Sequence, residues 1–165
     1  MTIKDRTPSE SATHHEHLVR PQHTNAHDTL FGGELVAWVD VAAATCAMRH
    51  SNKAVVTASI DAMHFVAPIG KGWIVNLDAR VNHVSRTSCE VGVRVTASHP
   101  ITGEINHTAS AYLTFVALDS NGRPTAMPGI IPETPKDQER MDAAIERRRS
   151  RLELKKVLEK RISSK

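Results

Sequence analysis

The feature that most constrains this chain is a stretch from Glu34 to His50 that contains neither glycine nor proline. It is rich in Ala, Leu, Val and Met, and its apolar residues fall on nearly every side of a helical projection. A helix that is apolar all round belongs in a protein core, and one of this length extends about 25 Å. The pattern therefore predicts one long central helix that begins after Gly32-Gly33 and ends at Ser51-Asn52.

Strand-like runs lie on both sides of this predicted helix. A short strand is predicted over 14–19, and four longer runs follow over 55–66, 73–84, 89–97 and 106–118. Short turns that contain Gly, Pro or Ser separate these four runs, as in an antiparallel meander. One buried helix followed by such a meander predicts an α+β fold. A single curved sheet covers one side of the helix, so a second copy of the chain could cover the rest.

The two ends of the chain differ from its middle. Residues 1–13 show no apolar periodicity and are predicted to form a flexible lead, 14–132 a folded domain, and 133–165 a basic helical tail. The tail carries eleven Lys and Arg against seven Asp and Glu, and the remaining chain carries ten against eleven. A basic tail fits either a polyanionic partner or a solvated helix face. Aromatic residues make up only 4% of the chain, which argues against a nucleic-acid-binding module that stacks bases.

Several kinds of protein are disfavoured by the remaining composition. No apolar run approaches the roughly 20 residues that cross a bilayer, and the first residues lack a signal-peptide pattern. Cys46 and Cys89 each lie in an apolar pattern and are predicted to be buried free thiols. Of the histidines between 14 and 17, only His15 and His17 share one face of a strand. The sequence therefore predicts a cytoplasmic protein with no membrane partner, no metal site and no cofactor.

Asp40 is the sharpest candidate for a chemical role. It lies in the middle of the predicted helix, among Val39, Val41 and Ala42 to Ala44. Aspartate is a poor residue for a helix interior and is rarely buried without a partner. Burial would raise its pKa and make it a better base, whereas an Asp40 that faces solvent or pairs with an arginine would have no such role.

Gly32 and Gly33 are the second candidate. Helix N-termini present free N–H groups, and glycines there let a ligand approach closely, so the pair could stabilise an oxyanion. The alternative is an ordinary tight turn into a helix. Asp40 lies eight residues beyond Gly32, about 12 Å along the helix, which is too far for both to reach one reacting carbonyl. If both act, the two groups at one site come from two copies in a two-fold dimer.

Around these residues the chain resembles the acyl-CoA hydrolase family of hotdog-fold thioesterases. The hallmark is an asparagine, a short loop, a Gly-Gly turn and a helix that bears aspartate followed by small residues, here Asn25, Phe31-Gly32-Gly33, Asp40 and Ala42 to Ala44. Further blocks in the right order span 56–69, 81–91 and 103–117, within a resemblance that covers Val19 to Pro132. The chain departs from the family at Ser85, where glycine is usual, and at Gly72-Trp73, where Gly-Asp is usual.

The resemblance implies a hotdog fold, with an antiparallel sheet wrapped around the helix, and hydrolysis of fatty acyl-CoA to CoA and a free acid. Asp40 would be the general base or the nucleophile, and Asn25 of a partner subunit would hold the carbonyl or the water. The amides of Gly32 and Gly33 would form the oxyanion hole. The turn formed by Ser85, Arg86, Thr87 and Ser88 would lie along CoA, although it could equally be an ordinary polar hairpin.

Other readings remain open at this stage. A hotdog domain that binds acyl-CoA without turnover is the main alternative, and the presence of both Asn25 and Asp40 argues against it. A hotdog dehydratase would need a catalytic histidine, and the matching helix has none before His50. The resemblance implies a homo-oligomer with a dimer as the minimal unit, most often a tetramer or hexamer. The apolar stripe at Leu154, Val157, Leu158 and Ile162 could pack on the domain or on another subunit.

Overall fold

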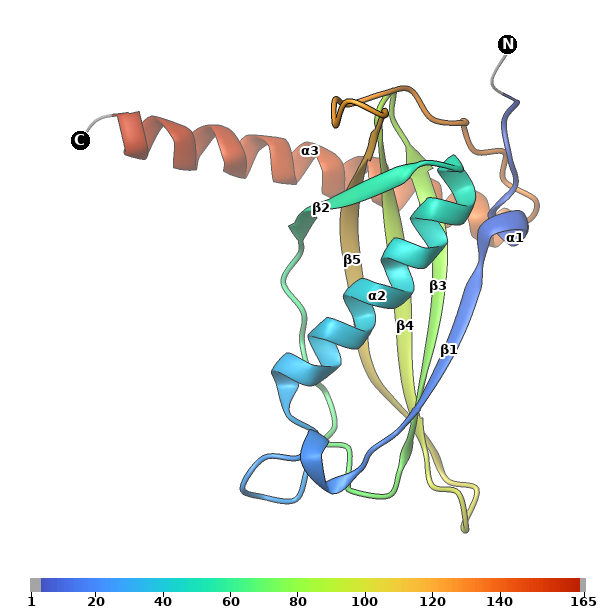
Figure 1. Ribbon diagram of the computed structural model, residues 1–165, viewed down its shortest axis with the longest axis vertical. Helices are drawn as coiled ribbons and strands as arrows, with labels where there is room; N and C mark the ends of the chain where they lie inside the picture. Colours follow the sequence, from blue (N-terminus) through green and yellow to red (C-terminus); the bar gives the residue numbers. More distant parts are fainter. Residues whose placement is uncertain (1–3, 164–165) are drawn as a thin grey trace.

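The computed structural model describes residues 4–163, which form one curved sheet, a long helix in its hollow and a second long helix behind it (Figure 1). The helices are α1 (Pro8–Ser11), α2 (Gly32–Ser51) and α3 (Pro135–Ser163), and a 3-10 turn, η1, spans Pro21–His23. The strands are β1 (Thr13–Leu18), β2 (Ala54–Ile60), β3 (Ile74–Val84), β4 (Ser88–Ser98) and β5 (Ile105–Leu118). The predicted α+β hotdog fold, with its long central helix and basic C-terminal helix, is confirmed.

The sheet is antiparallel throughout, in the order β1-β3-β4-β5-β2. Alternate residues of the three central strands face α2 and are almost fully buried, because successive strand side chains point to opposite faces. They form the core with one side of the helix: Leu77, Ala79, Val81, Val91, Val93, Val95, Ala111, Leu113, Phe115, Leu35, Val39, Ala43 and Cys46. β2 and β1 are the two edge strands, so β2 has one free edge.

Strand β2 is shorter than the sequence predicted. A bulge interrupts its pairing with β5 between Thr57 and Ser59, and the strand ends at Ile60 rather than near residue 66. Beyond this point the backbone is held by single hydrogen bonds, from the amide of Asp61 to the carbonyl of Tyr112 and from that of Val66 to Thr108. The apolar run therefore continues past the strand and becomes an extended connection that passes the start of α2.

One side of α2 is uncovered in the single chain, in agreement with the expectation that one curved sheet covers only part of a helix that is apolar all round. Ala37, Val41 and Met48 form an exposed stripe, and Val41 and Met48 keep 58% and 44% of their surface. The spacing of these residues places them on one face of a helix. This face and the free edge of β2 are the apolar surfaces that a second copy could cover.

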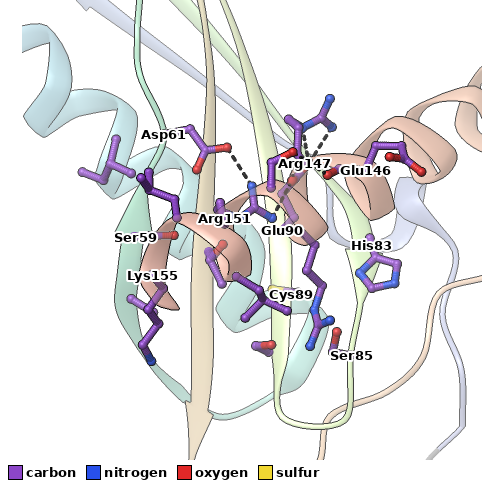
Figure 2. Close-up of a pocket in the computed structure, with 18 of the residues that line it drawn as sticks. Ser59, Asp61, His83, Ser85, Cys89, Glu90, Glu146, Arg147, Arg151 and Lys155 are labelled. Atoms are coloured by element: carbon purple, nitrogen blue, oxygen red, sulfur yellow. Dashed lines mark hydrogen bonds and ion pairs between the residues drawn. The ribbon is translucent and has the colours of Figure 1, made fainter. Parts of the chain in front are cut away.

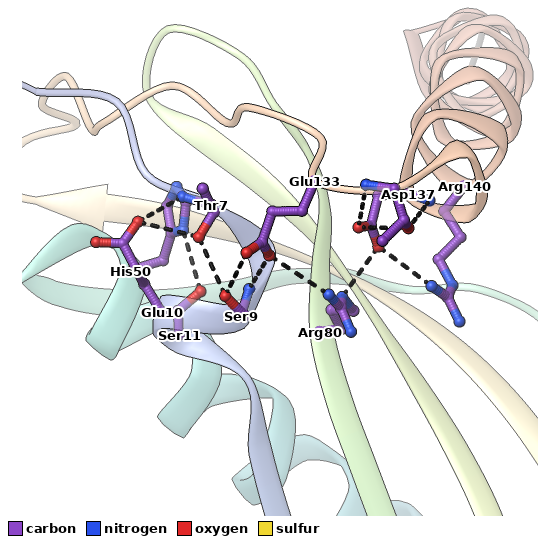
Figure 3. Close-up of polar contacts among 10 residues, drawn as sticks. Thr7, Ser9, Glu10, Ser11, His50, Arg80, Glu133, Asp137 and Arg140 are labelled. Atoms are coloured by element: carbon purple, nitrogen blue, oxygen red, sulfur yellow. Dashed lines mark hydrogen bonds and ion pairs between the residues drawn. The ribbon is translucent and has the colours of Figure 1, made fainter.

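The N-terminal segment is ordered from residue 4 onward, which differs from the flexible lead expected over 1–13. Pro8 and Ser11 are buried, and the amide and hydroxyl of Ser9 donate hydrogen bonds of 2.9 and 2.7 Å to Glu133. Glu133 also lies 3.6 Å from the guanidinium of Arg80 (Figure 3). Residues 1–3 of the predicted lead lie outside the described residues. The segment thus closes one end of the sheet against the connection that leads to α3.

Helix α3 crosses the outer face of the sheet and is fixed there by buried ion pairs. Glu90 on β4 is 2% exposed, and it pairs with Arg147 at 2.7 Å and Arg151 at 2.9 Å. The guanidinium of Arg147 also stacks 3.7 Å above the ring of Tyr112. A carboxylate that is buried this completely needs such partners, because an unpaired buried charge is strongly destabilising.

In the part of the chain that the structure describes, no helix is both long and apolar enough to cross a membrane.

Trp73, where the family usually has aspartate, directly precedes β3 and packs edge-on against His99 with ring centroids 5.2 Å apart. The departure from the family pattern therefore changes a contact at the far end of the sheet.

Candidate active site

Asp40 lies on α2 opposite the edge strand β2. Its Oδ1 accepts a hydrogen bond of 2.9 Å from the hydroxyl of Thr57, which comes from the inner face of β2. Both side chains are accessible in the single chain, and both border the exposed stripe of α2. The carboxylate therefore faces the surface that a second copy could cover, rather than the closed core.

Thr57 is the site residue that sequence reasoning missed. Its neighbours Val56 and Ala58 belong to the same strand-like run, and a threonine in such a run is an ordinary β-branched residue. Only the register of β2 shows that Thr57 pairs with the inward-facing Phe115, and so points toward α2. The available signal was its place inside one of the blocks that resemble the family.

Gly32 and Gly33 form the first turn of α2, where the leading N–H groups have no partner within the helix. A Cβ atom at Gly33 would lie 2.5 Å from Cε1 of Phe31, whereas one at Gly32 would lie 3.7 Å from Phe65. Leu30, Leu35 and Ile69 line an apolar cavity of about 350 Å³ next to these glycines. The helix start thus combines unpaired donors with an apolar wall.

Asn25 lies in the loop before α2 and is held by local hydrogen bonds. Its Oδ1 accepts from the amide of His27 at 2.9 Å and from that of Thr29 at 3.3 Å. Its Nδ2 donates to the Thr29 hydroxyl at 3.0 Å. The loop therefore fixes the position of Asn25 close to the start of α2 and away from the middle of the helix.

The structure does not bring all the predicted site residues together within one chain. Asn25 and the two glycines lie at one end of α2, and Asp40 lies about 12 Å along the helix from Gly32. The turn from Ser85 to Ser88 joins β3 to β4 at the opposite end of the sheet, close to where β5 ends. The two ends of the predicted site can meet only between different copies of the chain.

The turn from Ser85 to Ser88 borders a groove of about 990 Å³ between the sheet and α3. The amide of Ser85 donates to the carbonyl of Ser88 at 2.7 Å, which closes the turn. Arg86 is exposed at its tip, and Arg148 of α3 lines the same groove as the two serines. Burial and nearby Arg148 lower the pKa of His83, which lies at the wall of this groove.

The two cysteines and His17, one of the N-terminal histidines, contribute to packing. Cys46 and Cys89 are buried free thiols, as predicted, and burial raises the pKa of Cys46 to about 12 and that of Cys89 still further. Thiols of this kind are poor nucleophiles at neutral pH. His17 stacks on Trp38 with ring centroids 4.4 Å apart, so it packs against the helix.

Comparison with known proteins identifies the family. Residues 27–104 match the thioesterase superfamily. The chain is 43% identical over 133 residues to an uncharacterized acyl-CoA thioester hydrolase of Bacillus subtilis, covering 81% of this chain and 77% of that protein. The chain belongs to the acyl-CoA thioester hydrolases. As a member of this family it is a thioester hydrolase.

Solved structures of other acyl-CoA thioester hydrolases share the whole arrangement. An apo hexameric acyl-CoA thioesterase has a TM-score of 0.88 and 38% identity, and the match covers 92% of this chain and 97% of that one. The acyl-CoA hydrolase of Staphylococcus aureus, solved with butyryl coenzyme A and coenzyme A, has a TM-score of 0.84 and 39% identity over 93% and 96% of the two chains. Coverage this complete includes the sheet and at least the first part of α3.

Proposed function

We propose that this hydrolase cleaves fatty acyl-CoA thioesters at sites shared between two copies of the chain, with Asp40 as the residue that drives the attack of water. The observation that carries the proposal is the Thr57–Asp40 hydrogen bond, on a face of α2 that is apolar and uncovered. A carboxylate in this position becomes enclosed only when a second copy covers Val41 and Met48. Enclosure excludes bulk water and strengthens the electrostatic interactions of a catalytic group.

Variants of a relative support this choice of residues. The Staphylococcus aureus hydrolase has been solved with alanine in place of an asparagine, of an aspartate fifteen positions later, and of a threonine seventeen positions after that. Asn25, Asp40 and Thr57 have the same identities and the same spacing in this chain. The three positions replaced in the relative therefore correspond to Asp40 and Thr57, which a hydrogen bond joins here, and to Asn25, which the sequence resemblance singles out.

In the proposed mechanism the carboxylate of Asp40 accepts a proton from a water molecule, and the water oxygen adds to the thioester carbonyl. The amides of Gly32 and Gly33 from a second copy stabilise the oxyanion, and Asn25 of that copy orients the carbonyl or the water. The C–S bond then breaks, and CoA leaves as a thiol after it receives the proton. Thr57 keeps the carboxylate in one orientation throughout.

Direct attack by Asp40 is the alternative route, in which a mixed anhydride forms on the carboxylate and is then hydrolysed. A single turnover in ¹⁸O-labelled water distinguishes the two routes. The label enters the free acid when water attacks the thioester, whereas it enters the Asp40 carboxylate and leaves the acid unlabelled when water opens an anhydride at the Asp40 carbonyl.

The remaining parts of the proposal follow from the same site. The turn from Ser85 to Ser88 contacts CoA, and no cofactor is needed because water and a carboxylate suffice for thioester hydrolysis. Two copies joined along the free edge of β2 and the stripe of α2 are the minimal unit, within a tetramer or hexamer. The buried free thiols of Cys46 and Cys89 support a cytoplasmic location.

The test is release of CoA thiol from acyl-CoAs of increasing chain length, with Asp40→Asn and Ser110→Ala compared with the unchanged protein. Ser110 is an exposed residue on the outer face of β5 and serves as a control. We expect turnover by the unchanged protein and the control, and a loss of at least about a thousandfold in kcat for Asp40→Asn. Turnover that survives in Asp40→Asn would contradict the assigned role, and a preference for the shortest acyl chains would contradict fatty acyl-CoA as the substrate.

A further inference from the structure

The contacts of α3 show that this helix runs across the sheet and past its edge. Near its start, Asp137 lies 3.2 Å from Arg80 on β3, and further along Arg147 pairs with Glu90 on β4. Arg151 then reaches Asp61, one residue beyond the end of the edge strand β2, at 2.7 Å (Figure 2). The helix therefore passes β3, β4 and β2 in turn, and residues 152–163 continue beyond the edge (Figure 1).

The part of α3 beyond Arg151 has little support from its own chain. Its apolar residues are exposed along one side of the helix, and Ile162 retains 76% of its surface: Leu154, Val157, Leu158 and Ile162. An isolated helix of about 12 residues is only marginally stable in water, and most helices are stabilised by packing of an apolar face. The regular spacing of this stripe therefore indicates a packing partner.

The surface below this overhang is a groove next to the free edge of β2. Leu152, Leu154 and Leu158 line it from α3, and Ala58 and Ile60 line it from the end of β2. A strand edge with unpaired backbone groups and exposed apolar side chains is a template for pairing with another strand. The groove thus lies against the end of β2, and the other face of β2 borders the exposed stripe of α2.

We infer that the overhang of α3, residues 152–163, binds the outer face of the sheet of a second copy that joins this one along β2. The overhang is about 18 Å long, and neighbouring strands are about 4.8 Å apart, so it can span roughly three strands of that copy. The second copy is the occupant because the overhang begins where the unpaired strand edge ends. A two-fold pair would form this contact twice, once in each direction.

The outer face near the start of β2 has the chemistry that this contact needs. Ala117 and Phe115 point inward and are fully buried, so their neighbours Val116 and Leu118 point outward, as do their partners on β2, Val56 and Ala54. When two β2 strands pair antiparallel, the end of one lies next to the beginning of the other. The overhang of each copy then meets this apolar patch on the other, where Val56 is 46% exposed in the single chain.

The test compares two double variants of the full chain by light scattering and sedimentation over a range of concentrations. Leu154→Glu with Leu158→Glu places charge on the stripe, whereas Lys156→Gln with Lys160→Gln makes the same change in net charge on exposed positions outside it. We expect the first variant to raise the dissociation constant of the assembly at least tenfold and the second to change it less than twofold. Far-UV circular dichroism confirms that both remain folded.

Hydrogen exchange of the unchanged protein gives a second measurement that needs no substitution. The amides of 152–162 should be protected in the assembled protein and should lose that protection on dilution to monomers. Equal assembly of the two double variants overturns the inference. Protection that persists in the monomer also overturns it, because the helix would then pack on its own chain. Free exchange of these amides in the assembly overturns it as well, because the apolar stripe would then be available to a different protein. Both measurements are independent of turnover, so the proposed reaction and this contact can fail separately.

Discussion

The hydroxyl of Thr57 and the carboxylate of Asp40 are joined by a hydrogen bond of 2.9 Å that links the edge strand β2 to the central helix α2. The contact spans the two elements that border the uncovered face of the chain. Any shift of β2 relative to α2 therefore changes the orientation of the carboxylate. The activity of the site therefore depends on how firmly β2 is fixed relative to α2.

Thr57→Val keeps the shape of the side chain and removes the donor, so it tests this contact directly. We expect kcat to fall about ten- to a hundredfold with little change in KM, because the carboxylate loses its fixed orientation. Thr57→Ser retains a hydroxyl and should recover most of the activity. Steady-state kinetics of CoA release measure both, and activity that is kept in Thr57→Val but lost in Thr57→Ser would show that the methyl group and not the hydroxyl matters.

Glu90→Gln should destabilise the protein, because it leaves Arg147 and Arg151 facing a neutral amide at a site that is almost fully buried. We expect the free energy of unfolding to fall by about 2 kcal/mol, which lowers Tm by about 4–8 °C. Thermal unfolding at one fixed protein concentration measures the change. The matched control is Glu153→Gln on the exposed side of α3, and a similar loss there would rule out the buried network as the cause.

Gly92→Ala should destabilise the sheet beside the same carboxylate. The new Cβ would lie 2.6 Å from Nδ2 of Asn82, which donates to Glu90 at 3.1 Å, and overpacking of this kind costs about 1–3 kcal/mol. Asn82→Ala removes the obstructing amide. We therefore expect Gly92→Ala to cost about 1 kcal/mol less in the Asn82→Ala background, as measured by urea unfolding in a double-mutant cycle. Strict additivity would contradict the steric explanation.

His50 should make stability fall in mild acid. Its Nδ1 lies 3.1 Å from the Ser11 hydroxyl and its Nε2 lies 3.2 Å from the carbonyl of Pro128, and burial lowers its pKa below the usual 6.5. Below pH 6.5 the unfolded chain takes up a proton that the folded His50 ring does not. The stabilisation that His50 provides as a neutral ring is therefore complete above pH 6.5 and declines as the pH falls toward the pKa of the folded ring.

The pH dependence of Tm between pH 7.5 and 5 is the corresponding measurement. His50→Gln should be less stable at pH 7.5 but should lose less stability as the pH falls than the unchanged protein. His17 and His83, whose pKa values are also lowered by burial, contribute to the background slope in both proteins. A slope that is the same with and without His50 would show that its protonation is not linked to folding.

Periodicity was enough to predict the main elements, and local chemistry was enough to choose Asp40 as a candidate site residue. The central helix, the order of the strands and the basic C-terminal helix depend on patterns within each segment. The end of β2 was wrong by several residues because Asp61 to Val66 are as apolar as a strand but leave the sheet after a bulge. The residues of one strand do not specify where its pairing with the neighbouring strand is interrupted.

The contacts between distant segments could not be predicted. Thr57 becomes a site residue only through its register with Phe115, and Glu90 becomes an anchor only because α3 crosses the outer face of β4. The exposed stripe of α2 is another case, since the sequence shows an apolar helix but not which face one sheet leaves open. Each of these features depends on tertiary packing, which local propensities do not encode.

The hydrogen bonds between Ser9 and Glu133 join residues 124 positions apart, and Asp5 likewise accepts a hydrogen bond of 2.9 Å from the amide of Gly129. Contacts between residues so far apart in sequence form slowly, because a long loop must close before they contribute any stability. During synthesis Asp5 and Ser9 emerge long before these two partners exist. The two contacts must therefore wait until nearly the whole chain has been made, and their formation is a late step in folding.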